Sequence, residues 1–138
     1  AVARADVVCT VTTSADPVFS PGAIRPGTHI NAVGSYQPHV VEIPAETVQA
    51  ARVFVDHRES AMEEAGELIQ PIEAGLIAWG HVLGEVGDVL AGRVEGRPGD
   101  SDVTLFKSVG CAAEDCLAAG EVLARAKALG VGDETALI

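Results

Sequence analysis

Three short polar turns, each directly after a predicted strand, carry the side chains of this chain that are best suited to chemistry. The turn at residues 12–16 reads TTSAD, the turn at 35–38 reads SYQP, and the turn at 108–110 reads SVG. Ligands of open α/β sheets bind outside the carboxyl ends of the parallel strands, where hydroxyl and backbone N–H groups can contact a ribose or a phosphate. We therefore expect the three turns to lie along one rim and to form part of a ligand site. Plain turns, satisfied by their own Thr and Ser side chains, are the alternative.

Other reactive residue types have structural interpretations. Asp56 can cap the helix that follows it, with Glu59 three positions later completing a capping-box-like arrangement. Lys107 could face a phosphate, but at the end of a strand we expect it to be solvated. Cys111 and Cys116 are five positions apart, which is not a metal-ligand spacing, so they are expected to be small apolar fillers and no metal site is predicted.

Alternating strands and helices must position these turns. Apolar, β-branched runs predict strands at 6–11, 28–33, 52–56 and 103–107, and helices are expected at 44–50, 58–65, 82–90 and 111–129. The run at 6–11 is typical of a strand that is buried on both faces. Residues 66–80 are expected to be broken helix and loop, and residues 1–5 the end of a helix.

This order of elements predicts an α/β fold, namely part of a doubly wound parallel sheet of the Rossmann type followed by a long C-terminal helix. No G-x-G-x-x-G follows a strand, so the half of such a domain that carries the glycine fingerprint is not in this sequence. Because buried parallel strands occur in company, we expect the chain to begin part-way through a larger sheet.

The composition of the chain limits the classes of molecule that it is expected to bind. The chain has 138 residues, 48% of them hydrophobic, which is enough for one domain with a core. Its net charge of -11 argues against nucleic acid and against an anionic membrane surface. No apolar run approaches the roughly 18 residues of a membrane span, and no signal-peptide pattern is present. Three cysteines without a C-x-x-C motif predict reduced thiols and a cytoplasmic protein.

Several spaced blocks together resemble one family. They are ADVVCTVTTS (5–14), PGTHINAVG (26–34), VDHRES (55–60), GEVGDVLAG (84–92), DVTLFKSVG (102–110) and AED (113–115). In this order they look like the C-terminal half of the ornithine cyclodeaminase/mu-crystallin family. The resemblance implies that residues 1–110 are the C-terminal half of an NAD(P)-binding Rossmann domain. It also implies that residues 111–138 are a helix packing toward a substrate and dimerisation domain made mainly from the N-terminal half.

The resemblance also implies an activity. Members use NAD or NADP on imines of amino acids, so this chain is expected to belong to an oxidoreductase that reduces a small cyclic imine, such as pyrroline-2-carboxylate, by hydride transfer. Ornithine cyclodeaminase, an alanine dehydrogenase-like enzyme, and a non-catalytic protein that binds NADPH or a small ligand are the alternatives. A homodimer is expected for the full-length protein. The isolated chain is expected to bind NAD(P)H poorly and to be inactive, because it lacks the pyrophosphate loop.

The family's functional residues can be assigned to the aligned positions of this sequence. The resemblance assigns cofactor contacts to Thr12, Val33, Gly34, Ser35 and Ser108, and places Val109 near the substrate.

One departure from the family pattern concerns Tyr36, which stands where cyclodeaminases have an aspartate. A phenol with an unperturbed pKa of about 10 is not an ionised base at neutral pH, but it can donate a proton or a hydrogen bond. Tyr36 therefore disfavours deaminating cyclisation and favours imine reduction, with the phenol as the catalytic proton donor. Loop packing with the hydroxyl in water is the alternative for Tyr36. His39 is a second candidate donor, with a surface position as its alternative.

Overall fold

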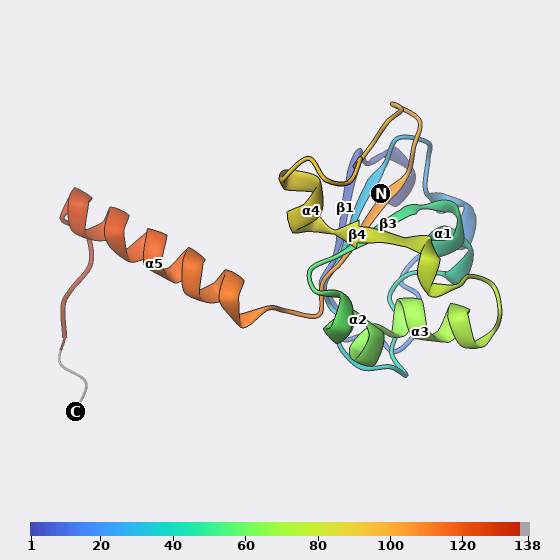
Figure 1. Ribbon diagram of the computed structural model, residues 1–138, viewed down its shortest axis with the longest axis horizontal. Helices are drawn as coiled ribbons and strands as arrows, with labels where there is room; N and C mark the ends of the chain where they lie inside the picture. Colours follow the sequence, from blue (N-terminus) through green and yellow to red (C-terminus); the bar gives the residue numbers. More distant parts are fainter. Residues whose placement is uncertain (136–138) are drawn as a thin grey trace.

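The computed structural model describes residues 1–135 and contains one sheet of five parallel strands (Figure 1). The strands are β1 (Val7–Thr10), β2 (His29–Ala32), β3 (Arg52–Val55), β4 (Val82–Glu85) and β5 (Thr104–Lys107), in the order β1-β2-β5-β3-β4. The predicted α/β fold with a parallel sheet is confirmed. Residues 136–138, at the end of the predicted segment 111–138, lie outside the described residues.

The register aligns the carboxyl ends of the strands. Thr10 pairs with Ala32, Ala32 with Lys107, and Lys107 with Val55. Because β5 is inserted between β2 and β3, the turn after the last strand lies beside turns that come much earlier in the sequence. The sheet thus brings the ends of β1, β2, β5 and β3 to one rim.

Helices cover the two faces of the sheet unequally. The α-helices are α1 (Ala45–Ala50), α2 (Arg58–Glu64), α3 (Gly66–Glu73), α4 (Val86–Leu90) and α5 (Ala112–Leu129), and the short 3-10 turns are η1 (Val2–Arg4), η2 (Pro21–Ala23) and η3 (Trp79–His81). Figure 1 shows α1, α2 and α3 gathered on one side of the sheet, α4 apart from them, and α5 extending away from the body. The long C-terminal helix predicted at 111–129 is confirmed, and it ends at Gly130, whose φ of 63° lies in the left-handed region.

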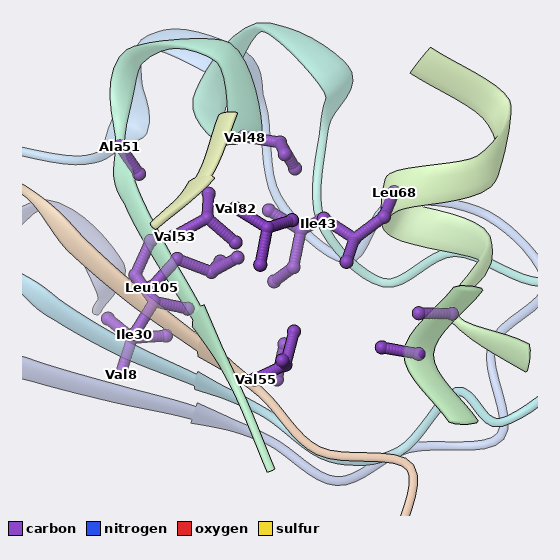
Figure 2. Close-up of a cluster of buried hydrophobic side chains, with 13 residues drawn as sticks. Val8, Ile30, Ile43, Val48, Ala51, Val53, Val55, Leu68, Val82 and Leu105 are labelled. Atoms are coloured by element: carbon purple, nitrogen blue, oxygen red, sulfur yellow. The ribbon is translucent and has the colours of Figure 1, made fainter. Parts of the chain in front are cut away.

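The core lies between the sheet and helices α1 and α3 (Figure 2). Alternate strand residues point into it, as the period of two in a strand requires. Its fully or almost fully buried members include Val8, Ile30, Val53, Val55 and Leu105 from the strands, with Val48 from α1, Leu68 from α3 and Ile43. Burial of this apolar surface is the main force that holds the sheet and these helices together.

The opposite face of the sheet is more open. Phe54 and Phe106 face Val86 and Val89 of α4 across a cavity of about 400 Å³. On β1, Cys9 is exposed and Val7 is 56% exposed, so the prediction that residues 6–11 are buried on both faces is wrong. The reason is positional, because β1 is an edge strand of the described sheet and no described helix covers its outer side chains.

The prediction of a helix at 82–90 is also wrong for the first half of this segment. Val82–Glu85 is strand β4, paired with β3, and only Val86–Leu90 is helical. Apolar spacing in so short a segment fits either structure, and pairing with a distant strand decides it. Residues 66–80, expected to be broken helix and loop, contain the eight-residue helix α3, and the helix end expected at 1–5 is one 3-10 turn.

No helix within residues 1–135 is both long enough and apolar enough to cross a membrane.

Replacing Leu105 by Ala tests the position of the core. Leu105 is fully buried in the central strand β5, so we expect Leu105→Ala to lower the free energy of unfolding by about 2–5 kcal/mol. Urea unfolding followed by circular dichroism measures the change. Leu117→Ala, on the exposed face of α5, is the matched control and should change stability by less than about 0.5 kcal/mol. Equal losses in both variants would contradict this placement of the core.

Candidate functional site

The predicted cofactor residues do lie along one rim. A Cβ added at Gly34 would be 2.4 Å from the backbone N and O atoms of Thr12, so the turns after β1 and β2 are in direct contact. The backbone N–H of Ser108 donates to the Ala32 carbonyl (3.0 Å), which places the turn after β5 beside the end of β2. The structure thus brings Thr12, Gly34 and Ser108 together, as the sequence predicted.

A buried carboxylate joins the first two turns. Glu42 Oε1 accepts hydrogen bonds from the backbone N–H and the hydroxyl of Thr12, both at 2.6 Å. Glu42 Oε2 accepts from the Gly34 N–H at 2.8 Å. Both donors of Thr12 are therefore directed inward at a protein group. A cofactor at this rim would meet the outer surface of the turn and not these donors.

These hydrogen bonds set the ionisation of Glu42. Burial raises the pKa of this carboxyl group, but the hydrogen bonds from Thr12 and Gly34 stabilise the charged form and outweigh burial. The pKa of Glu42 is consequently held below its usual value of 4.5.

A buried ion pair lies beneath the second turn. The Lys107 ammonium donates to the backbone carbonyl of Ser35 and to its hydroxyl, the latter at 3.0 Å, and lies 3.3 Å from Glu67 Oε2. Glu67 Oε1 accepts from the Ser35 hydroxyl and from the Glu42 N–H (2.9 Å). Lys107, Glu67 and Glu42 have no exposed surface, and Ser35 almost none.

The prediction that Lys107 is solvated is therefore wrong. Three acceptor atoms surround its ammonium group, which partly compensates the loss of water. Burial nevertheless lowers the pKa of Lys107 below its usual value of 10.5, and the charge of Glu67 offsets only part of that effect.

Asp56 shapes the third turn. Its Oδ2 accepts from the Ser108 hydroxyl (2.8 Å) and from the N–H groups of Val109 (2.9 Å) and Gly110 (2.8 Å). The prediction that Asp56 caps helix α2 is wrong, because the helix begins one residue later than the capping pattern requires. His57 is the N-cap, and its Nδ1 accepts from the Ser60 N–H. Gly110 has a φ of 100°, which lets the turn close around the Asp56 carboxylate.

Tyr36 lies at the edge of a small hollow on the rim. The hollow has a volume of about 160 Å³ and is lined by Thr13, Gly34, Ser35, Tyr36, Gln37 and Val40. Tyr36 is 61% exposed, so its phenol is accessible from solvent, and Val33, three positions earlier, is 41% exposed. Val109 is half-buried in the turn after β5.

Sequence reasoning did not assign four charged residues to the support of this site. It did not single out Glu42 and Glu67, and it expected Asp56 to be a helix cap and Lys107 to be solvated. One signal was available, since Glu42 stands in the apolar run VVEI (40–43) and Lys107 ends the apolar strand VTLFK (103–107). A charge embedded in a buried apolar segment must find a partner there. Nothing in the sequence indicates which partner it finds.

Comparison with known proteins agrees with this architecture. The model of the ornithine cyclodeaminase/mu-crystallin family matches residues 1–129. The chain belongs to this family. A Δ(1)-pyrroline-2-carboxylate reductase of Bacillus cereus is 40% identical over 134 residues, and an alanine dehydrogenase of Archaeoglobus fulgidus is 35% identical over 131 residues. These alignments cover 96% and 95% of this chain but only 41% and 40% of the relatives, so the chain spans about two fifths of their length.

Solved structures of the family have the same fold. The Δ(1)-pyrroline-2-carboxylate reductase of Thermococcus litoralis, in complex with NADH and L-proline, superimposes with a TM-score of 0.87 at 37% identity, covering 97% of this chain and 42% of that one. A probable ornithine cyclodeaminase of Bordetella pertussis gives a TM-score of 0.80 at 38% identity, with coverages of 96% and 43%.

The residues present fit one end of a dinucleotide. In residues 1–135, β1 is followed by a loop and the short turn η2, with no glycine-rich turn opening a helix that could hold a pyrophosphate. The rim instead offers an open surface with Val33, Tyr36 and a small hollow, which suits a flat, partly apolar ring. This surface is compatible with contact to a flat ring, and the described residues hold no pyrophosphate cradle.

The low pKa of Glu42 predicts a specific pH dependence of stability. Because the folded pKa lies below the unfolded value of 4.5, the carboxylate stabilises the fold above pH 4.5, and this contribution is lost as the pH falls through the folded pKa. Glu42→Gln should remove that pH-dependent part and cost about 1–3 kcal/mol at pH 7. Denaturant unfolding between neutral and acidic pH measures it.

Glu46→Gln, on the exposed side of α1, is the control for Glu42→Gln and should leave the pH profile unchanged. A wild-type profile that Glu42→Gln does not flatten below pH 4.5 would contradict the assignment.

Proposed function

We propose that this chain forms the nicotinamide side of an NAD(P)-dependent oxidoreductase that reduces a small cyclic imine, such as Δ1-pyrroline-2-carboxylate, to the corresponding cyclic amino acid. The observation that carries the proposal is the single rim on which three strand-end turns gather beside the exposed phenol of Tyr36. Reductases of this substrate among the relatives, and the neighbour that binds NADH and L-proline, support it.

In this proposal each residue of the rim has one task. Thr12, Val33, Gly34, Ser35 and Ser108 would form the turns that line the nicotinamide end of the cofactor, and Val109 would contact the substrate. Thr12 would do so by the outer surface of its turn, and Ser35 and Ser108 through the backbone that their buried hydroxyls fix. The bound cofactor supplies the hydride that the imine carbon accepts. Tyr36 donates a proton or a hydrogen bond to the imine nitrogen, and its exposure lets solvent restore the proton. The strand-end turns keep these groups in place because buried carboxylates hold their backbone N–H groups.

Deaminating cyclisation of ornithine is the second candidate, favoured by the similarity to the Bordetella pertussis structure. It requires a base near the amino group, whereas a phenol is suited to donate a proton or a hydrogen bond. Tyr36 therefore makes reduction the better proposal. An alanine dehydrogenase-like activity and non-catalytic ligand binding are further alternatives. The assays of the chimera described below distinguish them from imine reduction.

We also propose the domain arrangement and the setting. Residues 1–110 would complete an NAD(P)-binding domain, and residues 111–138 would pack toward a substrate and dimerisation domain in a homodimer. The exposed Leu117 and Leu123 on α5, and a neighbour described as an alanine dehydrogenase dimer, support this arrangement. Free cysteines support a reducing, cytoplasmic setting.

A chimera tests the function. The 138-residue chain replaces the aligned part of the Bacillus cereus reductase, and oxidation of NADH and NADPH is followed with Δ1-pyrroline-2-carboxylate as substrate. We expect turnover by the chimera, and no micromolar NADPH binding by the isolated chain in a fluorescence titration. A folded chimera that releases ammonia from ornithine, or that binds cofactor without reducing the imine, would overturn the proposal. A graft of the turn 33–39 alone serves as a second protein if the larger chimera does not fold.

Replacing Tyr36 by Phe tests the proton donor. Loss of a general acid should lower kcat by about 10²-fold while KM for the imine changes little, because the ring and its packing are kept. Glu46→Gln, on the exposed side of α1 and outside the lining of the hollow, is the control and should retain activity. Steady-state kinetics of the chimera measures both. An unchanged kcat in Tyr36→Phe would remove the phenol from the mechanism.

A further inference from the structure

The buried charges beneath the rim need an explanation, because they do not serve stability efficiently. Lys107 and Glu67 are completely buried and 3.3 Å apart. A buried ion pair can often be replaced by apolar side chains without loss of stability, since removing two charges from water costs about as much as their attraction returns. The presence of Lys107 and Glu67 in the interior is better explained by the backbone and side-chain groups that they bind.

The Lys107 ammonium donates its hydrogen bonds to Ser35 and forms an ion pair with Glu67. It donates to the carbonyl and the hydroxyl oxygens of Ser35, and Oε2 of Glu67 lies 3.3 Å away as the partner of an ion pair. Glu67 Oε1 in turn accepts from the Ser35 hydroxyl. The cluster therefore fixes both the backbone and the side chain of one residue, the residue that precedes Tyr36.

Helix α3 holds the other end of the same turn. A Cβ added at Gly66, the first residue of α3, would lie 2.2 Å from the Val40 carbonyl oxygen and 2.9 Å from that of Gln37. One turn further along α3, the Gln70 side chain donates to the Pro38 carbonyl (3.0 Å). The segment 35–40 is thus bound to α3 along its length, and Glu67 is the point at which α3 meets Lys107.

Tyr36 depends on this support because its own side chain has little packing. With 61% of its surface exposed, the ring is placed mainly by the backbone that carries it. We propose that Lys107 and Glu67 are positioning residues, which hold the turn 34–36 by the two oxygens of Ser35 and thereby aim the phenol of Tyr36. The inference rests on the proposed function for its catalytic consequence, but its structural part stands on these contacts alone.

The structural part is tested on the 138-residue chain without any cofactor. Tyr36 is the only tyrosine, so NMR of fluorotyrosine-labelled protein reports the mobility of that ring directly, and amide exchange reports the backbone of the turn. Lys107→Met leaves the Glu67 charge buried and unpaired and is expected to lower global stability as well. The double variant Lys107→Met with Glu67→Gln removes both charges and should regain most of that stability.

The decisive outcome is a double variant in which global stability is kept while the order of Tyr36 is lost. We expect near wild-type unfolding but a Tyr36 ring with greater mobility and amide exchange at residues 35–37 that is about tenfold faster. Arg125→Met with Glu121→Gln, which removes an exposed ion pair on α5, is the matched control and should change neither. A folded double variant with an ordered Tyr36 would overturn the proposal. A double variant that does not fold would do so too, because the pair would then serve the whole fold.

The catalytic part is tested in the chimera by a kinetic cycle. The double variant should lower kcat by about tenfold to a hundredfold with little change in KM, and adding Tyr36→Phe should cause almost no further loss. Additive losses would overturn the coupling between the pair and the phenol. If the chimera reduces no imine at all while Tyr36 still loosens in the double variant, the proposed function fails and the positioning role stands.

Discussion

The ends of parallel strands create the constraint on which this structure depends. Beyond the last paired residues of β1 and β5, backbone N–H groups such as those of Thr12, Val109 and Gly110 have no partner on a neighbouring strand, and leaving them without partners would cost free energy. Two carboxylates meet this need, because Glu42 receives the N–H groups of Thr12 and Gly34, and Asp56 receives those of Val109 and Gly110. The same hydrogen bonds that satisfy the backbone also give the rim its shape.

This arrangement separates the surface of the site from its support. The exposed groups at the rim include the phenol of Tyr36 and the apolar side chain of Val33, whereas the charged groups lie beneath them. A hydrogen bond to a charged group is stronger in a buried environment than in water, so these charges hold the backbone groups that they contact. The rim can therefore be open to a substrate while its backbone stays fixed.

Family membership gives the fold of this chain, whereas the choice of reaction depends on individual side chains at the rim. The family model spans residues 1–129 and relates this chain to reductases, dehydrogenases and a probable cyclodeaminase that share one fold. A shared fold does not select among these reactions, because the chemistry depends on individual side chains. In the proposed function the discriminating side chain at this rim is Tyr36, and its role as a donor would depend on how well the turn beneath it is held.

The sequence by itself determined the parallel α/β fold, four of the five strands, the long last helix and the gathering of three polar turns. These features follow from local patterns, such as β-branched apolar runs, Ala-rich helix and turn residues, which each segment carries within itself. The tertiary structure alone decided that Val82–Glu85 is a strand, since that depends on pairing with β3. It also decided the partners of Glu42, Asp56, Glu67 and Lys107. Those partners lie on other elements, from 25 to 72 positions away for most of the contacts, and no local pattern encodes which strand end will lie beside which carboxylate.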